Sequence, residues 1–245
     1  MRIPFFLGVI ASVALGDAAQ AGTVSFLDTG DGANYNVAFQ FKSDPSVSST
    51  LGICPSCGNP GRAIDFEVTV GQSQAISYYG GFLNLAETYN PLIQGAITSI
   101  STSMDKDFTI STNQAFNNRA RLLLRQDNNF YAATINGVPL QGPGTTGFLN
   151  FSASGLLATD FQQVDPATGI VTAASNPNFA GDPIVFGVAQ FFGSNGTPNT
   201  QLSAVFDNIS VTLTTASVPE PGTLGLLAAG MTGIAFLRRS RRAVG

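Results

Sequence analysis

Apolar and polar residues alternate along much of the chain between residues 22 and 216, with a period of two. The alternation is clearest in residues 63–70, 96–103 and 204–213. Because neighbouring side chains of a β-strand point to opposite faces of its sheet, this pattern predicts strands that bury one face. Further apolar runs predict strands at residues 24–27, 35–41, 76–83, 119–125, 130–135, 147–151 and 184–192.

Clusters of Asp, Asn and Gly separate these runs and favour turns. Residues 121–135 have the pattern of a hairpin around Asp127, Asn128 and Asn129. About ten strands at this spacing, with no convincing amphipathic helix, predict an all-β fold, an antiparallel β-sandwich. The strand order and the closing run at residues 206–211 resemble a jelly roll of the concanavalin and laminin-G type.

The first 21 residues have the features of a secretory signal peptide. Arg2 gives a positive start, residues 3–15 are mostly apolar, and Ala19, Gln20 and Ala21 form a small-residue cleavage site. We therefore expect a signal helix at residues 1–21 that is removed, so that the mature chain starts at residue 22. The body at residues 22–216 has a length suited to one domain.

Three features follow one another in residues 217–245. Pro219, Glu220 and Pro221 hold the backbone extended, because proline fixes its own φ and restricts the residue before it. Residues 222–237 are apolar and predict a short transmembrane helix, which would rise about 24 Å against a hydrocarbon core of roughly 30 Å. A basic end follows and belongs on the cytoplasmic side, so the body lies outside the membrane. Its members are Arg238, Arg239, Arg241 and Arg242.

This C-terminal arrangement resembles the PEP-CTERM sorting signal of exported proteins in biofilm-forming Gram-negative bacteria. Pro219, Glu220 and Pro221 match the signature of that signal, residues 222–237 its membrane span, and the four arginines its basic end. The resemblance implies that an exosortase, a membrane cysteine protease-transpeptidase, recognises the signal and removes the tail. It also implies export, transient anchoring in the inner membrane, delivery to the cell surface or extracellular matrix, and an association with exopolysaccharide. The alternative is an ordinary C-terminal anchor in which the tripeptide occurs by chance.

The body carries six cationic and 13 acidic side chains, a net charge of −7. That charge disfavours nucleic acid as a partner, because such binding depends mostly on neutralising phosphates. The chain contains no histidine, which excludes catalysis by histidine, and no glycine-rich phosphate loop opens a helix. No serine has a visible base that would activate it as a nucleophile. We expect a protein that is not an enzyme.

The two cysteines of the chain, Cys54 and Cys57, enclose a Pro-Ser pair. A closed zinc site needs four ligands, and the chain has no second cysteine pair. A redox pair favours a helix N-terminus, whereas these cysteines lie in Pro/Gly-rich sequence between predicted strands. In an exported protein, we expect a disulfide that constrains a loop at residues 45–61.

Residues 63–67 resemble the catalytic strand of one jelly-roll family of glycoside hydrolases, which reads Glu-Ile-Asp-Phe-Glu. Alternation places Ala63, Asp65 and Glu67 on one face of the strand. A retaining mechanism needs two carboxylates, and Ala63 occupies the position of the nucleophile. We therefore expect Asp65 and Glu67 to form the polar side of an ordinary strand. A secreted polysaccharide-acting hydrolase is kept as the alternative function.

The main hypothesis for the body is a structural or adhesive protein that binds glycan without catalysis. Sugar rings stack on aromatic side chains, and the chain has no tryptophan. Tyr78 and Tyr79 are the candidate glycan contacts, because adjacent side chains of a strand cannot both point inward.

No cofactor is needed for these hypotheses, but calcium has one candidate site. Asp28, Asp31 and Asn34 crowd one turn, and Asp207 with Asn208 lies near the end of the body. Oxygen ligands in loops suit Ca²⁺, although the spacing differs from that of an EF-hand. The same residue types are also favoured by turn geometry alone.

Overall fold

The computed structural model describes residues 22–28, 34–71, 75–112, 117–135, 143–173, 175–194 and 197–217. Residues 22–216 form one compact unit. The predicted signal peptide, Asp31 and the predicted sorting signal from residue 218 onward lie outside the described residues. Within the described ranges, no helix has the length and hydropathy needed to cross a membrane.

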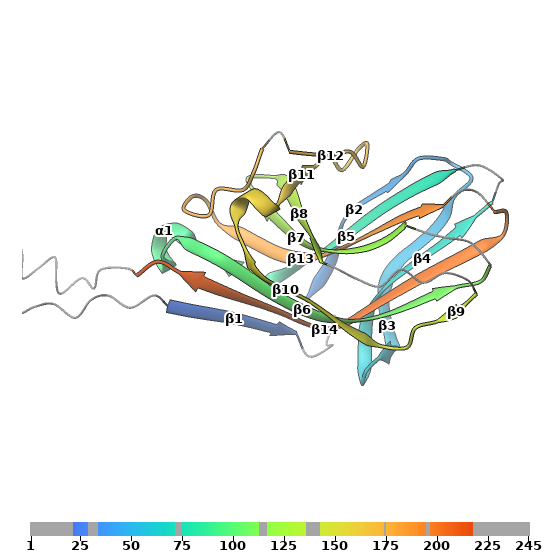
Figure 1. Cartoon of the computed structure of the whole chain (residues 1–245), viewed down its shortest axis with the longest axis horizontal. Helices are drawn as coiled ribbons and strands as arrows, with labels where there is room; N and C mark the ends of the chain where they lie inside the picture. Colours follow the sequence, from blue (N-terminus) through green and yellow to red (C-terminus); the bar gives the residue numbers. More distant parts are fainter. Residues whose placement is uncertain are drawn as a thin grey trace, which may run out of the picture. The chain divides into compact units, whose positions relative to one another are not determined.

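The body consists almost entirely of strands in two antiparallel sheets that pack face to face (Figure 1). Sheet A contains β1 (Gly22–Asp28), β3 (Ser48–Gly58), β4 (Gly61–Val70), β6 (Ile97–Ile110), β9 (Gly144–Thr145), β10 (Leu149–Leu156) and β14 (Thr200–Thr215). Sheet B contains β2 (Tyr35–Lys42), β5 (Ile76–Tyr89), β7 (Asn117–Gln126), β8 (Asn129–Ile135), β11 (Gln162–Val164), β12 (Val171–Thr172) and β13 (Ile184–Ser194). Two single-turn helices, α1 (Pro91–Gln94) and η1 (Ala158–Asp160), lie between strands.

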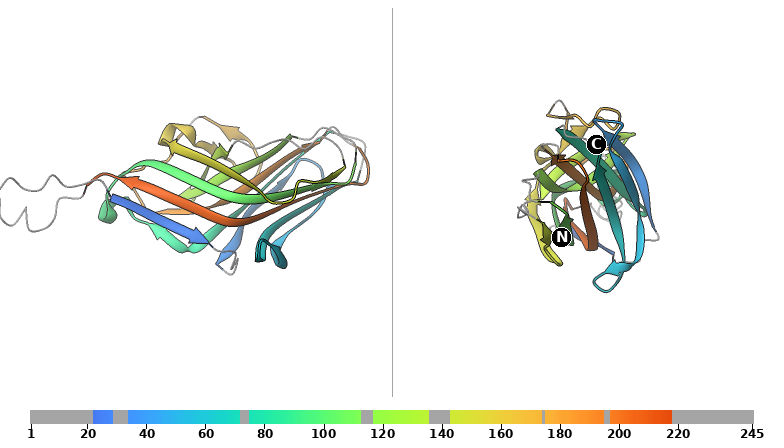
Figure 2. Two further views of the ribbon diagram at one scale, coloured as in Figure 1. Left: turned by 60° about the horizontal axis from the view of Figure 1, so that its bottom comes forward. Right: turned by 90° about the vertical axis from the view of Figure 1, so that its right-hand side faces the viewer.

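The strand orders are β10-β6-β14-β4-β3 in sheet A and β12-β11-β8-β7-β13-β5-β2 in sheet B. In sheet A, β9 also pairs with β6. The first half of β14 pairs with β4 and its second half with β1, on either side of a bulge at Asn208, whose φ is 49°. Gly22 of β1 is opposite Thr215 of β14, so the two ends of the body lie side by side (Figure 2).

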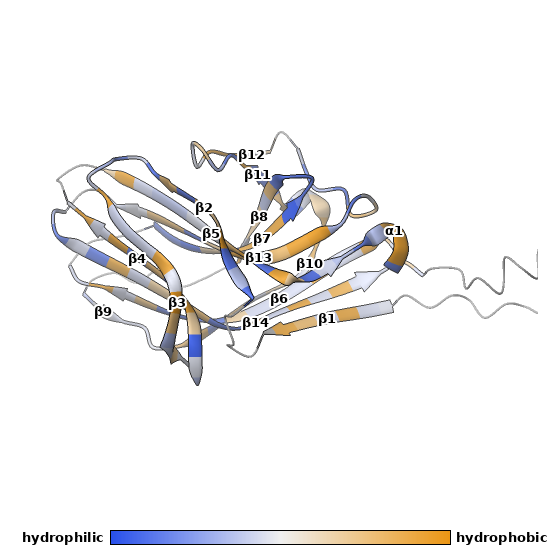
Figure 3. Ribbon diagram, turned by 180° about the vertical axis from the view of Figure 1, so that it is seen from behind, coloured by the Kyte–Doolittle hydropathy of each residue, from blue (hydrophilic) through white to orange (hydrophobic). Residues whose placement is uncertain are grey.

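The inward-facing apolar residues of sheet A, which alternate with polar ones along each strand, form one side of the core between the sheets. On β4, Ile64, Phe66 and Val68 are buried, while Asp65 is half-buried and Glu67 is exposed. The same alternation of hydrophobic and hydrophilic positions is visible along the ribbon (Figure 3). The ring of Phe66 makes edge-to-face contacts with Phe82 of β5 and Phe206 of β14, at centroid distances of 5.1 and 5.5 Å. Removal of these apolar side chains from water is the dominant driving force for the fold.

Sheet B is apolar on both of its faces. Its inner face packs against sheet A, and nearly every residue in the central part of β5 and β13 is buried. The outer face of sheet B, which points away from sheet A, carries a second apolar cluster. That cluster consists of Phe39, Tyr79, Leu83, Leu123, Ala132, Val164, Val185 and Ala189.

The predicted all-β sandwich is confirmed, and so is the hairpin at residues 121–135, which is formed by β7 and β8. Its turn residues Asp127 and Asn128 have φ values of 51° and 63°, the left-handed conformation that Asp and Asn tolerate. The predicted loop at residues 45–61 is wrong, because β3 runs through most of it and pairs with β4. β3 is an edge strand that is nowhere fully buried, so its sequence lacks the alternation that marks the central strands.

Candidate functional site

The outer face of sheet B brings aromatic and cationic side chains of four strands together. The strand register places them in two adjacent rows across β2, β5, β13 and β7. One row is Phe41, Tyr79, Phe191 and Arg119, and the next is Phe39, Gly81, Ala189 and Arg121.

Gly81 and Ala189 leave room at the centre of this face for larger neighbours. A Cβ atom on Gly81 would lie 2.7 Å from Phe39 Cε1 and 2.8 Å from Leu123 Cδ2, so the ring of Phe39 occupies the space above the glycine. Phe39 makes edge contacts with Tyr79 and with Phe130 of β8, at centroid distances of 5.3 and 5.2 Å. The result is a continuous aromatic layer on the sheet.

The turn between β11 and β12 reaches across this face. Gly169 in that turn packs on the ring of Phe41, although β12 and β2 are opposite edges of sheet B. Gly169 has a φ of 64° and no Cβ, and a Cβ at this position would clash with the ring. Asp165 closes the turn by accepting hydrogen bonds from Thr168 Oγ1 (2.7 Å) and from the Ala167 amide (2.9 Å). The turn therefore lies over the outer face of sheet B and covers part of it.

Among the described cations of this face, Arg121 is the one that is buried, with 7% of the residue exposed. Its Cζ lies 5.6 Å from the centroid of the Tyr79 ring, a cation–π distance. Its Nε and Nη1 are buried and have no hydrogen-bond partner among the described residues. Arg119 is exposed and Arg125 half-buried on the same face of β7.

The prediction that Tyr78 or Tyr79 is exposed is wrong, because their side chains are 0% and 1% exposed. The two rings do point to opposite faces of β5, but both faces are covered: Tyr78 lies in the core between the sheets and Tyr79 in the outer cluster. Burial raises the pKa of Tyr79 to about 12, although the neighbouring guanidinium of Arg121 partly offsets the increase. Burial also raises the pKa of Tyr78. In this structure neither ring offers a face to a sugar.

Asp65 and Glu67 lie on the outer face of sheet A. Burial and the nearby charge of Glu67 raise the pKa of Asp65, which accepts a hydrogen bond from Ser203 Oγ at 3.3 Å. Glu67 lines a groove of about 340 Å³ formed by β4, β14 and the end of β6. Ala63 is 1% exposed and carries no carboxylate, so the strand lacks the nucleophile of the resembled hydrolase motif.

Cys54 and Cys57 form a disulfide with their Cα atoms 5.5 Å apart, near the hairpin that joins β3 and β4. Asp207 is buried at the bulge of β14 and accepts hydrogen bonds from the backbone amides of Asn59 and Asn208. Asp28 ends β1, which pairs with the second half of β14. In the ranges that the structure describes, no three Asp, Glu, Cys or His side chains group as a metal site. The calcium site stays a prediction.

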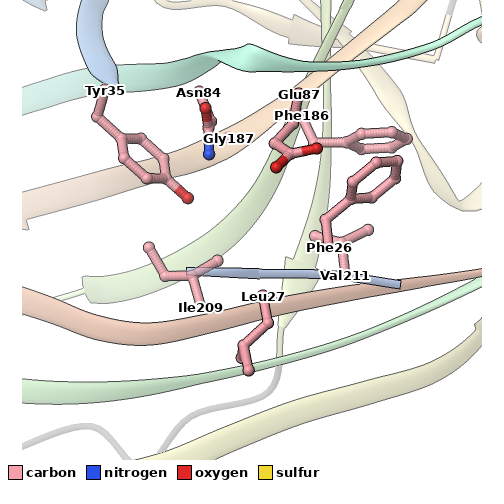
Figure 4. A pocket seen from close by; sticks show the side chains of 9 residues that line it. All are labelled: Phe26, Leu27, Tyr35, Asn84, Glu87, Phe186, Gly187, Ile209 and Val211. Carbon is pink, nitrogen blue, oxygen red and sulfur yellow. The ribbon is translucent and has the colours of Figure 1, made fainter. Parts of the chain in front are cut away.

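A small cavity lies between β1, β2, β5, β13 and β14 (Figure 4). Its volume is about 20 Å³, which is room for a single water molecule. It is lined by Phe26, Leu27, Tyr35, Asn84, Glu87, Phe186, Gly187, Ile209 and Val211. This cavity is too small to hold a sugar ring.

Comparison with known proteins identifies one sequence motif. Residues 217–242 match the PEP-CTERM protein-sorting motif. The chain carries this sorting motif directly after β14. No curated protein matches the chain.

Among solved structures, the body is similar to carbohydrate-binding modules. The family 11 module from Clostridium thermocellum, in complex with a mixed-linked β-1,3-1,4 tetrasaccharide, is 12% identical, with a TM-score of 0.41 over 82% of this chain and 99% of that module. The CBM22-1 xylan-binding domain from Paenibacillus barcinonensis is 8% identical, with a TM-score of 0.35 over 82% and 100% of the two chains. The mannan-recognising module TmCBM27 is 14% identical, with a TM-score of 0.33 over 80% and 97%.

Sequence reasoning missed the outer face of sheet B as a site. Arg119, Arg121 and Arg125 have the same parity along one predicted strand, so all three point to the same face. That spacing was a usable signal for a cationic face. The burial of Arg121 was not visible, because it depends on segments distant in the sequence.

Proposed function

We propose that the protein is exported and held in the inner membrane by its C-terminal segment until an exosortase removes that segment. The observation that carries this proposal is the match of residues 217–242 to the sorting motif. The motif begins two residues after β14 ends at Thr215, so the released product would be the β-sandwich almost alone. Its destination is the cell surface or the extracellular matrix.

The body serves there as an adhesive protein that binds glycan on the outer face of sheet B. Three half-buried aromatic rings, Phe41, Phe130 and Phe191, lie on this face. Partly exposed rings of this kind provide flat apolar surfaces for the faces of sugar rings. The exposed side chains of Arg119 and Thr134 lie nearby and can orient a bound sugar through hydrogen bonds. Catalysis by this chain is not part of the proposal.

Sorting is tested by replacing Pro219, Glu220 and Pro221 together with alanine in the native host. We expect the wild-type protein to be released from the membrane fraction only when the exosortase is present. The triple variant stays in the membrane in both hosts. The matched control is Pro177→Ala, which removes a proline from the body. Release of the triple variant at the wild-type rate would contradict exosortase sorting.

Glycan binding is tested with the full-length protein in detergent on an array of bacterial and plant polysaccharides. We expect retention on at least one glycan without turnover, and loss of most of it in Phe191→Ala. Leu92→Ala removes an exposed apolar side chain of α1 and serves as the control, because Leu92 is 69% exposed and lies outside this face. An array without any retained glycan would refute the function proposed for the body.

A polysaccharide-acting hydrolase is the second candidate, and the groove beside Glu67 is the observation that favours it. The raised pKa of Asp65 suits a general acid or base. This activity predicts release of reducing sugar that disappears in Glu67→Gln. Retention on the array with no release of reducing sugar would favour the binding protein.

A further inference from the structure

The single-turn helix α1 presents two adjacent apolar side chains to solvent. Leu92 and Ile93 are 69% and 73% exposed, the two highest values among the large apolar side chains of the described residues. Figure 3 shows α1 as a hydrophobic element at one end of the body. Isolated exposed apolar side chains are ordinary on a protein surface, whereas groups of them mark sites of interaction.

The surrounding hydrogen bonds fix the conformation of this turn. Asn90 caps it, because its Oδ1 accepts a hydrogen bond from the Leu92 amide at 3.1 Å. The hydroxyl of the buried Tyr89 donates to the carbonyl oxygens of Gln94 and Gly95, at 3.0 and 2.6 Å. The turn is therefore supported at both of its ends, and its apolar pair points outward as a fixed feature of the fold.

α1 lies where the chain leaves the body. The amide of Ala216 donates a hydrogen bond to the carbonyl of Ala96 at 2.7 Å, and Ala96 is two residues beyond the end of α1. Figure 1 shows α1 beside the end of β14. Only residues 217–221 separate Ala216 from the apolar run that begins at residue 222. Even when fully extended, a linker of this length reaches only about 20 Å. A body on this tether keeps α1 close to any membrane that the apolar run enters.

The segments around α1 contain no charged side chain. They are residues 22–27, 90–104 and 208–217, which include α1 and the adjoining parts of β1, β6 and β14. The six cationic and 13 acidic side chains of the body all lie elsewhere in the sequence. These segments can therefore approach lipid without the cost of removing a charge from water.

We propose that Leu92 and Ile93 insert into the outer surface of the inner membrane and orient the body while the C-terminal segment anchors it. The partner is the lipid bilayer at the boundary between headgroups and acyl chains, where apolar side chains leave water. Two side chains offer too little apolar area to bind a membrane alone, but the tether gives them a high effective concentration there. The inference rests on the proposed sorting route and adds a second contact that the body makes before its release.

The contact at α1 also limits where the processing site can lie. With α1 at the lipid surface, the linker that contains Pro219, Glu220 and Pro221 starts at the headgroups, within reach of a membrane-embedded protease. A body that rotates freely on its tether would present this linker at many heights. Restricting the free state in this way lowers the conformational entropy that is lost when the protease binds.

The test uses the absence of tryptophan from the chain, so that Leu92→Trp introduces a single indole on α1. The full-length protein is reconstituted into vesicles of phosphatidylethanolamine and phosphatidylglycerol, with or without bromine on the acyl chains. Bromine quenches only an indole that lies close to it, and we expect it to lower the emission of Leu92→Trp at least twofold.

Leu27→Trp is the matched control, because Leu27 is also apolar and 66% exposed. It lies near the other end of β1 from Gly22, which pairs with Thr215 at the end of β14. The strand rise separates Leu27 from Gly22 by about 17 Å. Brominated lipid should leave the emission of Leu27→Trp unchanged.

A second readout does not depend on an introduced indole. Leu92→Ser combined with Ile93→Ser removes the apolar pair from exposed positions, so the body should fold as before. In the native host, we expect exosortase-dependent release of this double variant to be at least threefold slower than that of the wild type. Leu27→Ser should be released at the wild-type rate.

Three outcomes would overturn the inference. In protein that floats with the vesicles, one is an emission of Leu92→Trp that brominated lipid does not change. Another is a blue-shifted emission without quenching, which would show that α1 packs against protein, such as a second copy of the chain. The third is release of the double serine variant at the wild-type rate. In each case anchoring and sorting stand, whereas a full-length protein that does not float with vesicles refutes the anchor and the inference together.

Discussion

A buried cation lies against each face of sheet B, Lys106 of sheet A on the inner side and Arg121 of β7 on the outer side, and the two are held in different ways. On the inner face, Lys106 of β6 donates a hydrogen bond from Nζ to Asn118 Oδ1 at 2.5 Å. Its Nζ also lies 5.5 and 5.3 Å from the ring centroids of Phe108 and Phe206. On the outer face, Arg121 has one aromatic neighbour and two nitrogens without partners among the described residues.

The two cations differ in whether they can lose their charge on burial. Burial lowers the pKa of Lys106 to about 7, so its amine can lose its proton near neutral pH and remain in the core as a neutral group. Arg121 has no neutral form at such pH values. The lysine can therefore be buried as a neutral group, whereas the arginine stays charged beside the ring of Tyr79.

The largest effect is expected from truncation of an aromatic ring on each face. Phe82 of β5 is 1% exposed and contacts Phe66 in the core, so Phe82→Ala should lower the free energy of unfolding by about 3–5 kcal/mol. Phe191→Ala on the outer face should cost less, about 1 kcal/mol, because its ring is only half-buried. Urea denaturation of both variants measures the difference. Equal losses would show that the outer layer is as much a part of the core as the inner one.

Lys106 should make stability depend on pH above neutrality. Its pKa is about 7 in the folded state and roughly 10.4 in an unfolded chain, so the unfolded state binds more protons between these values. Stability should therefore rise with pH from about 7 to 10, by up to about 1.4 kcal/mol per pH unit from this group. Below pH 7 the amine is protonated in both states, so the cost of burying its charge is fully present and stability no longer changes with pH through this group.

Lys106→Met isolates the contribution of the buried amine. Urea denaturation at pH 7 and pH 9.5 should show that the variant has lost most of the rise seen in the wild type. Lys42→Met, which changes an exposed lysine of β2, should retain it. A wild-type protein whose stability falls over this range, or a variant with the full rise, would contradict the assignment.

An effect smaller than that of Phe82→Ala is expected in the turn that covers the outer face. Gly169→Ala introduces a Cβ at a φ of 64°, where it meets the ring of Phe41, and should cost about 1–2 kcal/mol. Calorimetry should show a melting temperature lower by a few degrees. Gly52→Ala is the matched control, because a Cβ there has no neighbour within 4 Å. A melting temperature unchanged in Gly169→Ala would mean that the turn does not hold the face closed.

The sequence was sufficient for the architecture but not for the site. Strands such as β4 and β14 each bury one face, so alternation revealed them directly. Alternation also tells which residues share a face, as it does for Arg119 and Arg121. It does not tell whether that face is later covered by another part of the chain. For this reason the burial of Tyr79 and Arg121 could not be predicted, and β3, with both faces partly exposed, was mistaken for a loop.

The most direct test of the account is the intact mass of the protein recovered from its native producer, with and without the exosortase. The account predicts that the exosortase-positive cells yield a chain that starts at Gly22 and ends before Arg238. Cells without the exosortase should yield a chain that keeps the basic end. If the product from exosortase-positive cells still contains Arg238, Arg239, Arg241 and Arg242, the sorting motif is not processed and the proposed route to the surface is refuted.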